Sequence, residues 1–269
     1  MLSYDSKMYP ILVHLGPVTI YSYGVMMALG FLGASWVLGK GLHYQRQDAE
    51  LSTRLVLWAA IGGLVGARLL FIFANWTDFL YAPASFVFTG AGFVWHGGLI
   101  GGTVGVSLCI RQNSLNWAKT MDAVAPAIAF GHGLGRVGCH LAGDGDWGPP
   151  TDLPWGVAYT DALIGWPHAQ NVLVHPTPMY EMLFYFLVAA ILWMRRTAAH
   201  RPGALFWAYL LLAGIGRFFL EFVRLNPPVL WGLSRAQIIS SMMVVFGAVL
   251  LISQRTGVPP QARAKERIT

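Results

Sequence analysis

One stretch of the chain, residues 135–148, gathers side-chain types that bind anions and move protons. It reads GRVGCHLAGDGDWG, so an arginine, a thiol, an imidazole and two carboxylates lie among five glycines. The stretch begins where an apolar run ends, and charge at the edge of a hydrocarbon layer is expensive, so it persists mainly where it binds or reacts. Glycine permits tight turns and a close approach of ligand to backbone. The stretch therefore predicts a polar site at a membrane face.

Two further motifs combine ionisable side chains with helix-starting patterns. Residues 93–102 read FVWHGGLIGG, in which His96 is a candidate general base near neutral pH. The alternative is an interfacial histidine followed by glycines that pack helices together. Residues 175–181 read HPTPMYE, where the prolines favour a helix start. Glu181 is then either a carboxylate of the site or a charge that caps the helix.

Three arginines, Arg68, Arg136 and Arg217, occur within or at the edges of apolar stretches. A guanidinium is always charged, and its planar fork matches phosphate oxygens. The anion nearest to hand is a phospholipid headgroup. Glu221 and Arg224 follow Arg217 at spacings that predict one shared helical face. The alternative is that the arginines snorkel to the interface or pair with a carboxylate such as Glu221.

The composition places these motifs in a membrane protein. Of 269 residues, 55% are hydrophobic and 11% are charged, whereas a soluble domain carries about 25% charged residues. The alternation expected of barrel strands is absent, so we predict an all-α, polytopic membrane protein with about seven transmembrane helices and a small external head region. The apolar stretches are approximately 18–38, 55–75, 94–111, 121–139, 178–194, 203–222 and 236–253.

The basic residues follow this topology, so the formal charge of +6 does not indicate nucleic acid. No lysine or arginine lies between residues 69 and 110 or between 137 and 194, whereas the alternate loops are basic. The positive-inside rule then places the N-terminus outside and the C-terminus in the cytoplasm. We expect residues 1–253 to form a single integral membrane domain with an external head loop at 140–177. Residues 254–269 are expected to be a disordered cytoplasmic tail.

Taken together, the motifs resemble those of the prolipoprotein diacylglyceryl transferase family. Members of this family are bacterial inner-membrane enzymes. The resemblance is collinear over roughly residues 10–253, which makes it far more specific than any single motif. It implies seven transmembrane helices with an outside N-terminus, in agreement with the topology above. The matching segments are Tyr21-Ser22-Tyr23-Gly24, His96-Gly97-Gly98, Gly135-Arg136-Val137-Gly138, His175 to Glu181, Arg217 to Arg224, and residues 232–237.

The resemblance also implies a reaction. A diacylglyceryl group passes from phosphatidylglycerol to the thiol of a lipobox cysteine in a preprolipoprotein, a thioether forms, and glycerol 1-phosphate leaves. The expected partners are phosphatidylglycerol, lipobox-containing preprolipoproteins and the lipid bilayer of the bacterial inner membrane. No cofactor, metal or nucleic acid is expected, and we expect a monomer.

This reaction needs deprotonation of a thiol and positive charge beside the leaving phosphate. Under the resemblance, His96 is the candidate base, while Arg136 and Arg217 hold the phosphate. Tyr23 is expected to donate a hydrogen bond to the headgroup. The other residues expected in the substrate site are Gly97, Gly98, Gly138, Cys139, His140, Asp144, Asp146, Tyr180, Glu181, Glu221 and Arg224.

The chain departs from the family pattern at three places. Cys139 and His140 stand where an asparagine and an aromatic residue are common, residues 144–146 replace a glutamate with a one-residue insertion, and Ala213 replaces a tyrosine. Cys139 and His140 resemble a nucleophile and its base, although neighbours in a helix point apart. With the two aspartates they also resemble a metal site. Two alternatives stay open: a paralogue with another acceptor, and a non-catalytic phospholipid-binding protein.

Overall fold

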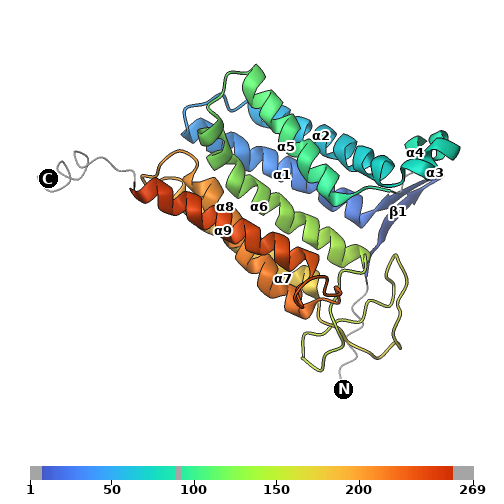
Figure 1. Ribbon diagram of the computed structural model, residues 1–269. Coiled ribbons are helices and arrows are strands. Elements are labelled where there is room, and N and C mark those ends of the chain that lie inside the picture. Colours follow the sequence, from blue (N-terminus) through green and yellow to red (C-terminus); the bar gives the residue numbers. More distant parts are fainter. Residues whose placement is uncertain (1–7, 89–91, 257–269) are drawn as a thin grey trace, which may run out of the picture. The chain divides into compact units, whose positions relative to one another are not determined.

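The structure is a computed structural model that describes residues 8–88 and 92–256, so most of the predicted C-terminal tail lies outside the described residues (Figure 1). Each of the seven predicted apolar stretches forms a helix. Among the described residues, five helices are long and apolar enough to cross a membrane. They are α1 (Ser22–Tyr44), α2 (Leu51–Ala74), α7 (Thr177–Arg195), α8 (Ala204–Leu220) and α9 (Arg235–Thr256). Helix α8 continues into the 3-10 helix η1 (Glu221–Val223). The remaining stretches form α5 (Trp95–Gln112) and α6 (Trp117–Ala142), and the short helices α3 (Trp76–Tyr81) and α4 (Pro83–Phe88) lie between α2 and α5.

The N-terminal segment differs from the prediction in two ways: it contains strands, whereas we predicted an all-α protein, and the first helix begins later than residue 18. Residues 18–21 form β2 (Val18–Tyr21), which pairs antiparallel with β1 (Ile11–Leu15). Gly16, with a φ of +61°, makes the turn between them. Helix α1 begins only at Ser22, whose backbone N–H donates to the Pro10 carbonyl at 3.0 Å. The β-branched residues of β2 favour this extended conformation over a further helical turn.

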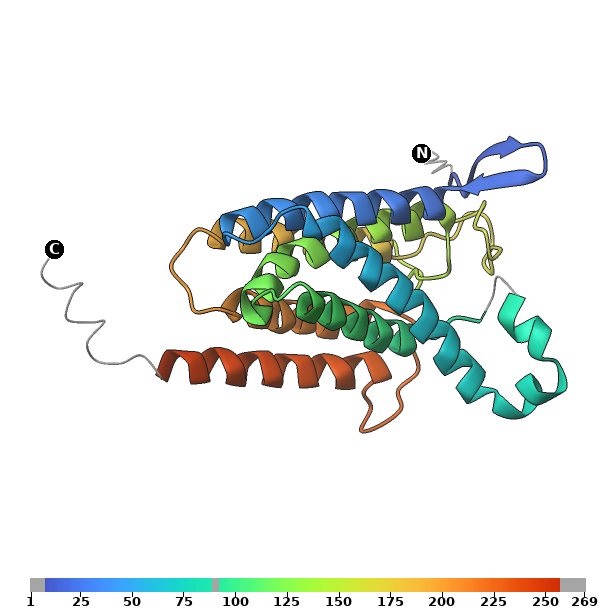
Figure 2. The same ribbon diagram turned by 90° about the horizontal axis from the view of Figure 1, so that it is seen from above.

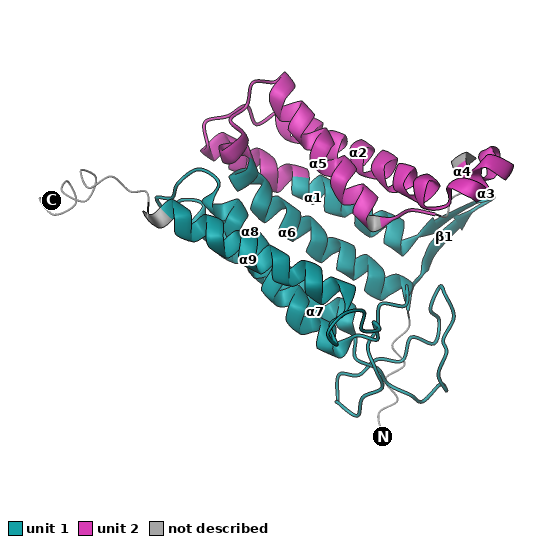
Figure 3. Cartoon of the chain, viewed as in Figure 1, with its two compact units in different colours: residues 1–34, 121–269 teal, residues 35–120 magenta. Residues whose placement is uncertain are grey.

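The chain divides into two compact units, coloured separately in Figure 3. Unit 1 comprises residues 1–34 and 121–269, and unit 2 comprises residues 35–120. Unit 1 holds the hairpin, the first half of α1, and helices α6 to α9. Unit 2 holds the rest of α1 and helices α2 to α5.

The helices of unit 1 pack around small and aromatic side chains. Helices α6, α7, α8 and α9 run alongside one another in both Figure 1 and Figure 2, and α7 and α9 each pack against α8. Small residues from α6 allow the bulkier side chains of α7 and α8 to approach it closely. The buried core consists of Ala125, Ala129, Tyr185, Val188, Ala189, Leu192, Leu205, Tyr209 and Ala213.

A buried carboxylate on α6 sets the position of α8. The side chain of Asp122 is 1% exposed; one oxygen accepts the Gly203 N–H at 2.7 Å, and the other accepts two N–H groups of the first turn of α8 at 2.8 and 3.2 Å. These N–H groups have no partner within their own helix, so Asp122 serves as a helix cap supplied by another helix. The register of α6 and α8 is thereby set. Arg136 and Arg217 lie about four turns further along these helices.

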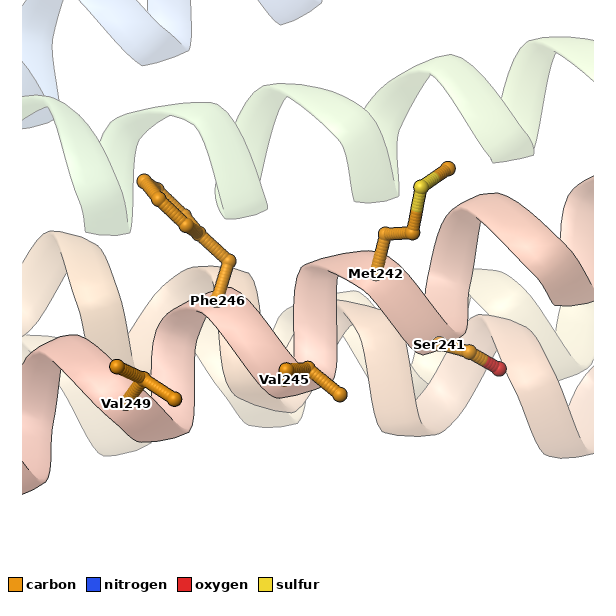
Figure 4. Close-up of a pocket in the computed structure, with 5 residues that line it drawn as sticks. All are labelled: Ser241, Met242, Val245, Phe246 and Val249. Atoms are coloured by element: carbon orange, nitrogen blue, oxygen red, sulfur yellow. The ribbon is translucent and has the colours of Figure 1, made fainter.

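One face of α9 remains apolar and exposed. Figure 4 shows a groove along this face, with Met242 and Phe246 pointing to the same side of the helix. These two side chains are 58% and 55% exposed, and Val245 and Val249 beside them are similarly exposed. Such a surface suits the hydrocarbon chains around a membrane-spanning helix.

Unit 2 is built on a close contact between α2 and α5. A Cβ atom at Gly66 of α2 would lie 2.8 Å from the Cα atom of Gly101 in α5, and Gly97 likewise meets the Gly66 backbone. Glycine is therefore required at this crossing because any side chain would hold the two backbones apart. The helix-packing interpretation of the glycines after His96 is confirmed at Gly97 and Gly101.

We expect Gly66→Ala to lower the melting temperature of the purified protein in detergent by several degrees. The added methyl group has no space, and overpacking typically costs about 1–3 kcal/mol. Gly63→Ala is the matched control, because its Cβ atom would lie 3.5 Å from the nearest heavy atom, the Gly98 carbonyl oxygen. Equal melting temperatures for the two variants, measured by differential scanning fluorimetry, would contradict this account of the crossing.

Candidate functional site

Two buried glutamates in unit 1 hold three arginines. Glu181 on α7 is fully buried, and its Oε2 atom lies 2.6 Å from Arg136 Nε while its Oε1 atom lies 2.9 Å from Arg224 Nη1. Glu221 in η1 pairs with Arg217 at 2.5 Å. A buried charge is tolerated when it is paired and hydrogen-bonded. We call these five residues, together with Asp146, the arginine cluster.

The interpretation of Glu181 as a helix cap is wrong. Helix α7 begins at Thr177 with Pro178 in its first turn, and no acidic residue lies in that turn. Glu181 is the fifth residue of the helix, so its carboxylate lies too far along to bond the free N–H groups at the start. It turns toward Arg136 and Arg224 instead.

Asp146 completes the cluster from the head loop. One carboxylate oxygen accepts from Arg136, and the other accepts from Arg224 Nη2 at 2.5 Å. Helix α6 ends at Ala142 because Gly143 adopts a φ of +60°, and Gly145 turns the chain again with a φ of +91°. These turns bring the loop back over the end of α6. The side chain of Asp146 is 31% exposed, the largest fraction in the cluster.

The expectation that Arg224 shares a helical face with Arg217 and Glu221 is wrong. Helix α8 ends at Leu220, η1 covers the next three residues, and Arg224 is extended with φ −119° and ψ 162°. The extended backbone directs its guanidinium to Glu181 and Asp146. Arg217 and Glu221, four residues apart, do pair as the spacing predicts.

The surroundings shift the pKa values of Asp144 and Asp146, two aspartates of the head loop, in opposite directions. Burial alone would raise the pKa of Asp146, but Arg224 and Arg136 outweigh burial and hold that pKa below its ordinary value. Asp146 therefore stays ionised throughout the neutral range. Burial raises the pKa of Asp144, which accepts a hydrogen bond from the Cys139 thiol.

The interpretation of Cys139 and His140 as a nucleophile and its base is wrong. The two side chains leave α6 in different directions, as neighbours in a helix do. Cys139 Sγ lies 3.6 Å from Arg136 Nη1, whereas His140 Nδ1 lies 3.0 Å from the Tyr159 hydroxyl. His140 thus belongs to the packing of the head loop, where Tyr159 is fully buried.

Three of the four residues that resembled a metal site lie close together, but the charges around them disfavour a cation. Ligand atoms of Cys139, Asp144 and Asp146 lie within 4.8 Å of one another, and His140 is not among them. Both oxygens of Asp146 already accept from guanidinium groups. A cation placed there would face two arginines at close range, which disfavours a metal ion.

Tyr23 and Tyr180, two predicted site residues, lie in the first turns of α1 and α7. A Cβ atom at Gly138 would lie 3.3 Å from Tyr23 Cδ2, so this glycine lets the start of α1 approach α6 and places Tyr23 near the end of that helix. Tyr23 is 41% exposed. The Tyr180 hydroxyl accepts a hydrogen bond from Trp155 Nε1 at 2.8 Å and lies 3.2 Å from His175 Nδ1.

The remaining predicted residues lie in unit 2. His96 is exposed in the first turn of α5, and Gly97 and Gly98 face α2. Arg68 Nη1 donates to the Gly92 carbonyl at 3.2 Å, and its guanidinium lies over the Phe93 ring. Since these residues belong to a different unit from the arginine cluster, their participation in one site stays a prediction.

Several side chains on or near the arginine cluster were not predicted as site residues. Ser234 Oγ and Asn226 Nδ2 donate to Glu221 at 2.6 and 2.8 Å, and Thr177 donates to the Asp146 carbonyl. His132 stacks on Tyr185 with 3.7 Å between ring centroids. His132 precedes Arg136 by four residues within an apolar stretch, and this spacing was an available signal. Ser234 lies within the family-like segment 232–237, which was also an available signal, whereas only the fold brings Asn226 to Glu221.

The fold and the cluster define a multi-pass membrane protein with a buried arginine–carboxylate site between its helices and a loop. Comparison with known proteins specifies the family. Residues 10–253 match the model of the prolipoprotein diacylglyceryl transferase family, and the chain belongs to that family.

Curated relatives of this chain carry the name phosphatidylglycerol–prolipoprotein diacylglyceryl transferase. The relative from Clostridium tetani is 35% identical over 241 residues, which cover 89% of this chain and 95% of the relative. The relative from Methylococcus capsulatus is 36% identical over 266 residues, which cover 93% and 97% of the two chains. A protein of the same name, numbered 2, from Clostridium perfringens is 32% identical and covers 86% of this chain.

Proposed function

We propose that this chain transfers the diacylglyceryl group of phosphatidylglycerol to the thiol of a lipobox cysteine in preprolipoproteins. The observation that carries the proposal is the cluster of three arginines held by buried glutamates, in a chain whose relatives bear the name of this enzyme. Guanidinium groups that are fixed before the substrate arrives form an electrostatic site for a phosphate ester.

In the reaction, a thiolate attacks the diacylglyceryl carbon that carries the phosphate ester. The carbon–sulfur bond forms as the carbon–oxygen bond breaks, and the oxygen keeps the electron pair as glycerol 1-phosphate departs. The phosphate group thereby gains negative charge between the bound lipid and the product. Arginines interact more strongly with the more negative group, so Arg136 and Arg217 stabilise the transition state more than the bound lipid.

The other predicted roles complete the proposal. His96 accepts the proton of the substrate thiol, and Tyr23 donates a hydrogen bond to the headgroup. Glu221 and Arg224 orient the cluster. Gly97, Gly98 and Gly138 let the substrate approach the backbone closely. The remaining predicted residues line the substrate site: Cys139, His140, Asp144, Asp146, Tyr180 and Glu181.

We further propose that α5 and α6 complete a set of seven membrane spans with the other five long helices. The distribution of lysine and arginine then places the N-terminus outside and the C-terminus in the cytoplasm of a bacterial inner membrane. In this arrangement residues 1–253 form one membrane domain that acts as a monomer, and the arginine cluster lies at the outer face.

The decisive test is incubation of the purified protein with phosphatidylglycerol and a synthetic lipobox peptide, followed by mass spectrometry. We expect a diacylglyceryl mass increase on the peptide cysteine and the release of glycerol 1-phosphate. A peptide with serine in place of cysteine, and vesicles of phosphatidylcholine, are the controls. Binding of phosphatidylglycerol without any mass increase would instead identify a non-catalytic lipid-binding protein.

A further inference from the structure

The arginine cluster is electrically balanced before any substrate arrives. Its three guanidinium groups, on Arg136, Arg217 and Arg224, face three carboxylates, on Glu181, Glu221 and Asp146. A phosphodiester would bring an additional negative charge next to these carboxylates. Placing a further anion in a balanced and partly buried cluster is unfavourable. One carboxylate must therefore withdraw for phosphate to bind well.

The two glutamates are firmly held. The side chains of Glu181 and Glu221 are 0% and 2% exposed. Glu181 projects from α7 between two arginines, and Glu221 also accepts hydrogen bonds from Ser234 and Asn226. Moving either carboxylate would require a helix end to shift and would leave buried arginines unpaired.

Asp146 differs from the glutamates in its exposure and in projecting from a loop. Its side chain is 31% exposed and projects from the head loop. The loop reaches it through Gly143 and Gly145, both in the left-handed region, where glycine changes conformation at low cost. The Asp146 side chain can therefore leave the cluster without disturbing a helix.

The geometry of Asp146 also matches that of a phosphate group. Its two oxygens bind two different arginines, Oδ2 to Arg136 and Oδ1 to Arg224. The two unesterified oxygens of a phosphodiester present the same kind of acceptor pair to guanidinium donors. With Asp146 withdrawn, the cluster has one unbalanced positive charge, which equals the single negative charge of phosphatidylglycerol.

We propose that Asp146 is an internal anion that occupies the Arg136–Arg224 pair, and that the lipid phosphate displaces it on binding. This inference rests on the proposed function, because it assigns the phosphate to the arginine cluster. It extends the role of Arg224, which then contacts the phosphate together with Arg136 in addition to orienting the cluster. After the reaction, Asp146 competes with glycerol 1-phosphate for Arg136 and Arg224, and this competition promotes release of the product. The same competition keeps soluble phosphate compounds from occupying the empty site.

The test compares Asp146→Asn with Asp161→Asn by isothermal titration calorimetry, with glycerol 1-phosphate as the probe. Asparagine preserves the shape of aspartate but removes its charge. We expect Asp146→Asn to bind glycerol 1-phosphate about tenfold more tightly than the unaltered protein, because a competing closed state is removed. Asp161 is an exposed residue of the same loop, so its variant controls for net charge and should bind as the unaltered protein does. Equal or weaker binding by Asp146→Asn would overturn the proposal.

A second measurement reports displacement directly and does not depend on any variant. Hydrogen–deuterium exchange of the peptide covering residues 143–148 should increase when phosphatidylglycerol is added, because Asp146 loses its partners. Protection of this peptide would show that Asp146 stays bound and would overturn the proposal. Neither measurement requires turnover. A protein that passes both tests but transfers no diacylglyceryl group would therefore contradict the proposed function and leave this inference standing.

Discussion

Arg136→Ala should reduce diacylglyceryl transfer by about a thousandfold, as removal of a preorganised electrostatic donor does in other enzymes. The guanidinium forms ion pairs with both Glu181 and Asp146, so it is anchored from two sides before substrate binds. Arg136→Lys keeps the charge but loses the planar fork, and we expect it to remain at least tenfold impaired. The measurement is the rate of thioether formation on a lipobox peptide, per folded molecule.

Arg195→Ala is the matched control, because Arg195 is an exposed arginine in the last turn of α7. It should retain the full rate. Folding is checked by size-exclusion chromatography and melting temperature, since alanine at position 136 also leaves two carboxylates without one partner. If Arg136→Lys transfers at the unaltered rate, then Arg136 does not use its fork to hold the phosphate.

Glu181→Gln should destabilise the protein by about 3–5 kcal/mol, the usual cost of removing one partner of a buried ion pair. Glu181 is fully buried, and its two oxygens neutralise Arg136 and Arg224. Without its charge, two guanidinium groups would share Asp146 as their nearest counter-ion. We expect a lower melting temperature in detergent and a loss of transfer activity even below that temperature.

Glu50→Gln provides the comparison, because Glu50 is exposed just before α2 and its charge is solvated. Its melting temperature should be unchanged. Glu181→Asp is a second comparison, since it keeps the charge but shortens the side chain, and it should recover part of the stability. A melting temperature for Glu181→Gln equal to that of Glu50→Gln would show that the carboxylate is not needed to balance the arginines.

The helices were predictable because hydropathy alone constrains a chain in a bilayer. A stretch of apolar residues has to form internal backbone hydrogen bonds in lipid, so each predicted stretch appears as a helix. The start of the first helix was predicted too early because Val18 and Ile20, which are apolar, suit a strand as well as a membrane helix. Hydropathy does not distinguish the two, and pairing with β1 decided the outcome.

Residue types and spacing also predicted several members of the arginine cluster. Arg136 and Arg217 stand out because charge within apolar sequence is rare, and the pairing of Arg217 with Glu221 follows from helical spacing. The extended conformation of Arg224 could not be predicted from helical spacing, because the helix ends before this residue. The pairing of Cys139 with His140 failed for the opposite reason, because that segment remains helical to Ala142.

The sequence by itself determined a membrane protein of a recognisable family, with arginines in apolar surroundings, because composition and local periodicity are properties of the chain alone. Only the tertiary structure decided which carboxylate neutralises which arginine. Glu181, Asp146 and Arg224 lie 35 to 78 residues apart in the chain, yet they share hydrogen bonds. Charge pairing depends on distances of a few ångströms, and helix packing and the turns at Gly143 and Gly145 set those distances.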